Sequence, residues 1–157
     1  MRTRHHAGFA LLAALALVAT LAVGSVTARG GRTFDLALSS AAEVPTPTDD
    51  ATGTAVLTIN PGHQEVCFEI GWDDVEGTIV AAHIHLAPTG VAGPVVVPLF
   101  IGPQTSDASG DGSTSGCVSS DLGSSELAAI IGHRSSYYVN VHSTVNPAGA
   151  IRAQLSD

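Results

Sequence analysis

The sequence predicts an all-β fold, either an antiparallel β-sandwich or a Greek-key barrel of about seven or eight strands. Short segments alternate apolar and polar residues with the period of a β-strand. Pro and Gly recur every few residues and separate these segments, and helical spacing is confined to one short patch at 124–131. Without helix-length connections between strands, an antiparallel arrangement is favoured over a parallel sheet.

The alternating segments give the expected strands in order: 34–38, 53–59, 65–70, 79–86, 94–100, 116–118, 137–142 and 150–155. Clusters of turn-forming residues separate several of them, at 60–62, 88–90, 111–112 and 146–149. Two further segments are expected as loops, 45–52 because of its Pro, Thr and Asp content, and 102–116 because it is a Gly, Ser, Thr and Asp tract.

Residues 1–28 have the layout of a signal peptide. Arg2 and Arg4 precede an apolar run at 8–23, and Ala28 offers a small residue for cleavage. The run of about 16 apolar residues is shorter than the roughly 20 that span a bilayer, so cleavage is favoured over a retained anchor. We therefore expect a short leader at 29–32 and one domain at 33–157, secreted or periplasmic and not inserted in the membrane.

The charge balance excludes some classes of partner. The 157 residues contain no Lys, and six Arg face 14 acidic residues, for a net charge of −8 that becomes −10 when Arg2 and Arg4 are removed. A strongly acidic chain is a poor ligand for nucleic acid or for anionic membranes. The sequence also contains neither the Gly-x-Ser-x-Gly motif of α/β-hydrolases nor a phosphate-binding glycine loop.

The two cysteines, Cys67 and Cys117, both lie in the region expected outside the cytoplasm, where a disulfide can persist. One intramolecular bridge is then expected. The alternative is a pair of buried thiols, because sequence spacing does not establish that the two Cα atoms come within bridging distance.

Three of the seven histidines form a pattern. His83 and His85 are two residues apart and lie on the same face if 79–86 is a strand. His142 and Asn140 alternate with valines, so they oppose the apolar face of their own strand. If the two strands share a sheet, three neutral imidazoles converge, which suits copper or zinc. The alternative is a polar layer of packed, hydrogen-bonded histidines.

A second polar group is expected beside these histidines. A hairpin through 143–149 returns Arg152 to the side of Asn140 and His142. A buried guanidinium needs a carboxylate, because an unpaired interior charge is costly. Glu43, at the end of the first strand, is the favoured partner, which gives a network of Glu43, Asn140 and Arg152. In the alternative, Arg152 and Glu43 are both solvated.

Several short motifs occur in an order that resembles the CHRD domain, the module first named from chordin. They are Glu-Val-Pro at 43–45, Ala-Ala-His-Ile-His at 81–85, Gly-Val-Ala-Gly-Pro-Val at 90–95, Tyr-Val-Asn-Val-His at 138–142, and Pro-Ala-Gly-Ala-Ile-Arg-Ala-Gln-Leu at 147–155. The resemblance covers 33–155. One departure is Ala150, where the family pattern usually carries Glu before Ile-Arg.

The resemblance implies an extracellular β module, which occurs alone in many bacterial secreted proteins and in tandem in chordin, a protein that binds growth factors. It implies no catalytic activity. The first expectation is therefore a non-catalytic secreted module that binds an extracellular or envelope protein or polysaccharide. The alternative is an extracytoplasmic copper- or zinc-binding protein that uses His83, His85 and His142.

A weaker likeness is to copper/zinc superoxide dismutase, an all-β sandwich whose copper is held by a His-x-His pair and a later histidine before a Gly-rich segment with Arg. His83, His85, His142 and Arg152 occur in that order. The chain has no candidate for the histidine that bridges copper and zinc, and no His-rich zinc loop. The likeness therefore implies a similar sandwich and at most a simplified metal site, since fold alone does not carry function.

Overall fold

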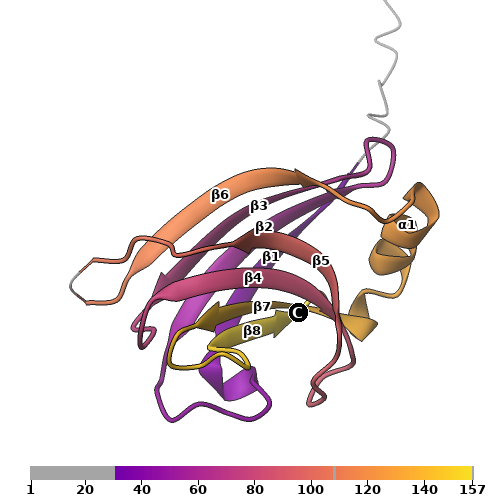
Figure 1. Ribbon diagram of the computed structural model, residues 1–157. Coiled ribbons are helices and arrows are strands. Elements are labelled where there is room, and N and C mark those ends of the chain that lie inside the picture. Colours follow the sequence, from indigo (N-terminus) through magenta and orange to yellow (C-terminus); the bar gives the residue numbers. More distant parts are fainter. Residues whose placement is uncertain (1–30, 108, 157) are drawn as a thin grey trace, which may run out of the picture.

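The structure is a computed structural model that describes residues 31–107 and 109–156 (Figure 1). The expected signal peptide, 1–28, lies outside the described residues, as does the first half of the expected leader. Arg32 already belongs to the first strand, where it pairs with Ile59. Within the described ranges, no helix is both long enough and apolar enough to cross a membrane.

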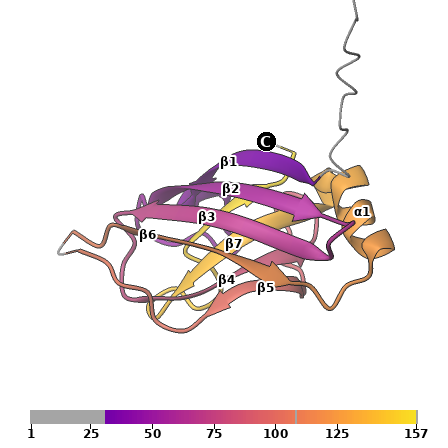
Figure 2. The same cartoon turned by 90° about the horizontal axis from the view of Figure 1, so that it is seen from above.

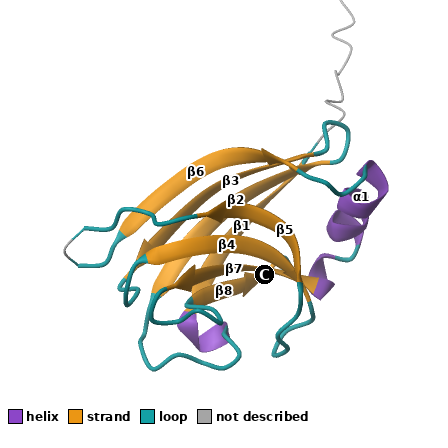
Figure 3. Ribbon diagram, in the orientation of Figure 1, coloured by secondary structure: helices purple, strands orange, loops and turns teal. Residues whose placement is uncertain are grey.

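In the described residues, eight antiparallel strands form one sheet in the order β5-β4-β7-β8-β1-β2-β3-β6, which confirms the predicted all-β class. The strands are β1 (Arg32–Ser39), β2 (Thr52–Asn60), β3 (Glu65–Asp73), β4 (Ile79–Leu86), β5 (Val95–Ile101), β6 (Gly112–Ser119), β7 (Tyr137–Ser143) and β8 (Ile151–Gln154). Helix α1 (Ser124–Gly132) and the 3-10 turns η1 (Ser40–Ala42) and η2 (Arg134–Ser136) are the helical elements of the described residues (Figure 3).

The sheet folds over on itself into two layers. β8 joins β1 through a single residue pair, Arg152 with Ser39, and the sheet bends at this joint. Strands β1, β2, β3 and β6 make one layer, and β7, β4 and β5 lie across them in the other (Figure 2). Helix α1 lies at one end of the two layers, where it buries Leu127 and Ile130 (Figure 1).

Strict alternation along the strands builds the core between the layers. In β2, for example, Ala55, Leu57 and Ile59 are buried, whereas Thr52 and Thr54 are exposed. Burial of one large aliphatic side chain contributes about 1.5–3 kcal/mol, so the register that turns these residues inward is strongly favoured.

The sequence prediction was wrong at the end of the Gly- and Ser-rich tract, because 112–116 is strand rather than loop. β6 pairs with β3 from Glu65 opposite Ser119 to Trp72 opposite Gly112. It is an edge strand of the sheet, and of its apolar residues only Val118 packs against the core. Backbone pairing rather than an apolar pattern therefore holds β6 in place.

The outer faces of β7 and β8 are buried as well, although they carry polar side chains. Tyr138, Asn140 and His142 of β7 and Arg152 and Gln154 of β8 are each at most 8 % exposed. Polar groups buried outside the apolar core need partners, since an unpaired polar group is costly to desolvate. These residues mark the place where a functional site is expected.

Candidate metal centre

Adjacent strands bring the three predicted histidines together on this outer face. β4 and β7 pair so that His85 lies opposite Tyr138 and His83 lies opposite Asn140. The ring centroid of His142 is 4.9 Å from that of His83 and 5.6 Å from that of His85. One ring nitrogen from each histidine can be chosen so that all three lie within 4.8 Å of one another.

Backbone carbonyls fix the orientation of two of the rings. Nδ1 of His85 lies 2.9 Å from the Gly93 carbonyl oxygen, and Nδ1 of His142 lies 3.1 Å from that of Pro147. A carbonyl oxygen can only accept, so each Nδ1 carries the proton and donates. Nε2 of both rings is then left with its lone pair, the state in which imidazole binds a metal.

Nε2 of His142 has a hydrogen-bond partner, whereas Nε2 of His85 has none among the described residues. The His142 nitrogen lies 3.1 Å from Nδ1 of His83, which must donate to it because His142 Nε2 has no proton. Nε2 of His85 is buried and has no hydrogen-bond partner among the described residues. A buried nitrogen lone pair without a donor is unusual in a folded protein, and it leaves this nitrogen available to a ligand.

The spacing of one pair of nitrogens fits a small metal ion, and the third nitrogen lies within 4.8 Å of both. Two nitrogens bound at 2.0–2.1 Å to a tetrahedral zinc are ~3.3 Å apart, close to the 3.1 Å between the His83 and His142 nitrogens. His83 would release its hydrogen bond by moving its proton from Nδ1 to Nε2. The donor set of three neutral imidazoles suits copper or zinc, and such an ion would supply Lewis-acid or, for copper, redox chemistry.

All three imidazoles have a pKa below the ordinary histidine value. Burial, together with the smaller effect of the positive charges of His142 and His85 when they are protonated, lowers the pKa of His83 to about 4. Burial also lowers the pKa of His85 and His142, against the raising effect of their hydrogen bonds to the Gly93 and Pro147 carbonyls. The ligands therefore stay neutral, and ready for a metal, below neutral pH.

We expect these pKa shifts to destabilise the metal-free protein in acid. Below pH 6.5 His83 becomes protonated in the unfolded chain but stays neutral in the folded chain. The free energy of unfolding therefore falls as the pH drops from 6.5 towards about 4. Urea unfolding at about pH 7 and about pH 4.5 should show a smaller acid loss in His83→Gln than in the parent. Equal losses in both proteins would contradict the assignment.

Tyr138 lies between a candidate ligand and a cation. The His85 ring stacks on Tyr138 with the centroids 4.9 Å apart and the planes at 14°. The guanidinium carbon of Arg152 lies 3.5 Å from the Tyr138 ring centroid. The Tyr138 hydroxyl also accepts a 3.0 Å hydrogen bond from the Gly93 backbone N–H. The stack and Gly93 together fix the plane of the His85 ring.

β8 holds the loop between β4 and β5 that carries Gly93. Arg152 donates to the carbonyl oxygens of Val91 at 3.0 Å and Pro88 at 3.4 Å. Gln154 donates to the Ala87 carbonyl at 2.9 Å. Sequence reasoning missed the parts of Tyr138 and Gln154, because the loop contributes backbone carbonyls that leave no side-chain signal.

Glu43, which follows η1 directly, joins the polar side chains on the outer face of β7 and β8. Asn140 Nδ2 donates to Oε2 of Glu43 at 3.4 Å. Oε1 of Glu43 and Oδ1 of Asn140 have no hydrogen-bond partner in the part of the chain described. Burial raises the pKa of Glu43 to about 7, and the nearby charge of Arg152 opposes this rise. The structure thus brings Glu43, Asn140 and Arg152 together, but within the described residues no hydrogen bond joins Arg152 directly to Glu43.

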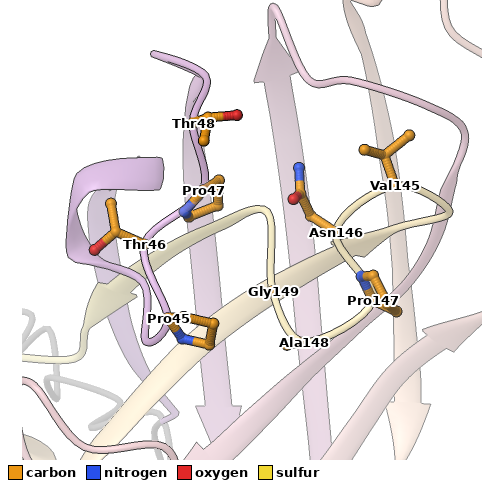
Figure 4. A pocket seen from close by; sticks show the side chains of 9 residues that line it. All are labelled: Pro45, Thr46, Pro47, Thr48, Val145, Asn146, Pro147, Ala148 and Gly149. Atoms are coloured by element: carbon orange, nitrogen blue, oxygen red, sulfur yellow. The ribbon is translucent and has the colours of Figure 1, made fainter.

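A groove of about 340 Å³ lies next to these polar residues, between the segments 45–48 and 145–149. Figure 4 shows Pro45, Pro47 and Thr48 of one segment across from Val145, Asn146 and Pro147 of the other. Asn146 bridges to Asp49 with a 3.1 Å hydrogen bond. Since the Pro147 carbonyl holds His142, the groove and the histidine cluster share one loop.

The two cysteines lie apart from the histidines, on the layer of β1, β2, β3 and β6. Cys67 of β3 and Cys117 of β6 stand directly opposite each other, with their Cα atoms 3.9 Å apart, and form a disulfide. The bridge predicted from the exported character of the chain is therefore present.

The fold and the site define a disulfide-bonded β-sandwich domain with a cluster of three histidines, two of them buried and one half-buried. The family model described as the CHRD domain matches residues 34–155, and the chain belongs to this family. No curated protein and no solved structure matches the chain.

Proposed function

We propose that this CHRD domain binds one copper or zinc ion outside the cytoplasm through His83, His85 and His142. The observation that carries the proposal is Nε2 of His85, a buried lone pair without a partner among the described residues. In a purely structural polar layer, nearly every buried nitrogen has a hydrogen-bond partner. A metal ion bound by all three histidines would satisfy this nitrogen.

The surroundings of the rings support the proposal. Metal-binding histidines commonly donate their second N–H to a carbonyl or carboxylate, which fixes the tautomer that presents a lone pair. His85 and His142 both do so, to Gly93 and Pro147. The disulfide fits an extracellular or periplasmic location, where the ion would be acquired. Binding of an envelope protein or polysaccharide stays a prediction from the family resemblance.

We expect the metal-free parent to bind one equivalent of Cu²⁺ or Zn²⁺, and His85→Ala to bind it at least about tenfold more weakly, because one of three ligands is lost. Isothermal titration, with elemental analysis of the protein as isolated without a histidine tag, measures both quantities. The matched control is His63→Ala combined with His133→Ala, which removes two exposed histidines that are not part of the cluster.

Parent and His85→Ala with equal affinity would show that the ion binds elsewhere. Loss of binding in the control double variant as well would show nonspecific binding to surface imidazoles. A parent that binds no ion under either test would leave a structural histidine layer, and the proposal would be wrong.

A further inference from the structure

A second group of metal-ligating side chains lies on the opposite layer, around the disulfide. Cys67 points away from the core, because its neighbours Val66 and Phe68 are buried in it, and Cys117 lies directly opposite Cys67 on β6. Cys117 is exposed and Cys67 is half-buried. Solvent reagents can therefore reach the sulfur atoms.

Glu65 belongs to the same face. It precedes Cys67 by two residues on β3, and its Oε1 lies 3.5 Å from the Cys67 sulfur. One carboxylate oxygen and the two sulfurs all lie within 4.8 Å of one another. A disulfide sulfur is a poor ligand, but a thiolate is a strong one. The cluster becomes a donor set of two sulfurs and one oxygen when the disulfide is reduced.

We propose that reduction of the Cys67–Cys117 disulfide creates a binding site for a thiophilic divalent cation such as Zn²⁺, with Glu65 as the third ligand. An external dithiol supplies two electrons and two protons, so that the protein disulfide becomes two thiols and the dithiol becomes a disulfide. The cation then displaces the two thiol protons, which pass to solvent, and binds the two thiolates.

The strand geometry allows this exchange. Two sulfurs bound at 2.3 Å to a tetrahedral zinc are ~3.7 Å apart, and directly opposite Cβ atoms in an antiparallel pair are about 4.5–5.5 Å apart. Among the described residues β6 pairs with β3 alone and buries little, so it can shift slightly while the other strands keep their pairing. The disulfide and the bound cation exclude each other, and the redox state of the two cysteines therefore decides whether this site exists.

The test uses Cd²⁺, whose thiolate complexes absorb in the ultraviolet, so the signal reports sulfur ligands and not the histidine cluster. The disulfide is reduced with a phosphine, which takes oxygen from one water molecule, becomes the phosphine oxide and leaves two thiols. The phosphine is removed before titration without oxygen. We expect one equivalent of Cd²⁺ to produce the thiolate band in reduced protein, and no band in oxidised protein.

Glu65→Gln should weaken this binding at least about tenfold. Glu69→Gln is the matched control, because Glu69 lies on the same face of β3 opposite Ser115 and is not part of the cluster. Absence of the band in reduced protein would overturn the proposal. Equal binding by Glu65→Gln and the parent would also overturn it, including the case in which reduction unfolds the chain and free thiols bind alone. Loss of copper or zinc binding at the histidines would leave this result unaffected.

Discussion

Arg152→Ala should destabilise the domain by about 3 kcal/mol or more, although it removes no residue of the apolar core. Arg152 is 2 % exposed and donates to two loop carbonyls, Val91 and Pro88, that lose these donors in the variant. Its charge also lies over the Tyr138 ring, a contact worth up to about 2 kcal/mol when desolvated. Urea unfolding of parent and variant measures the loss, with the exposed Arg134→Ala as control.

The loss should also depend on pH. Arg152 holds down the pKa of Glu43, so its removal moves that pKa further above the present value of about 7. The folded variant then keeps a proton on Glu43 that the unfolded chain releases, and stability falls as the pH rises above 4.5. The difference between variant and parent should be larger at about pH 8 than at about pH 5. A difference that does not change with pH would show that Arg152 acts through packing and hydrogen bonds alone.

The sequence predicted the strands that bury an apolar face, since alternation with period two is itself the cause of their register. Ala55, Leu57 and Ile59 illustrate this case. β6 was predicted only near Cys117, because an edge strand rich in Ser, Thr and Gly buries almost nothing and is held by its neighbour's backbone. No local pattern distinguishes such a strand from a polar loop.

The same reasoning explains what was predicted of the site. The face shared by His83, His85 and His142 follows from alternation, and their proximity follows once β4 and β7 pair. The hydrogen bonds that fix the rings could not be predicted, because Gly93 and Pro147 contribute backbone oxygens. Any residue type offers a carbonyl, so only the path of the loop places it.

The other large expected effect is at Gly149, in the loop between β7 and β8. This glycine has φ +150, a conformation that other residues rarely adopt. A Cβ there would collide with Oε2 of Glu43 and with Nδ2 of Asn140, two buried groups that are hydrogen-bonded to each other. We expect Gly149→Ala to cost about 2–4 kcal/mol in the free energy of unfolding, since it combines backbone strain with overpacking of a buried polar pair.

Gly132→Ala is the matched control for this variant. Gly132 ends helix α1, and nothing lies within 4 Å of the position where its Cβ would be. Replacement of a helical glycine by alanine is neutral or stabilises by up to about 1 kcal/mol. Thermal or urea unfolding should therefore show a lower free energy of unfolding for Gly149→Ala and an unchanged or higher one for Gly132→Ala. If Gly149→Ala has the same free energy of unfolding as the parent, Glu43 and Asn140 can move apart without cost. This buried polar pair is then less rigid than its burial indicates.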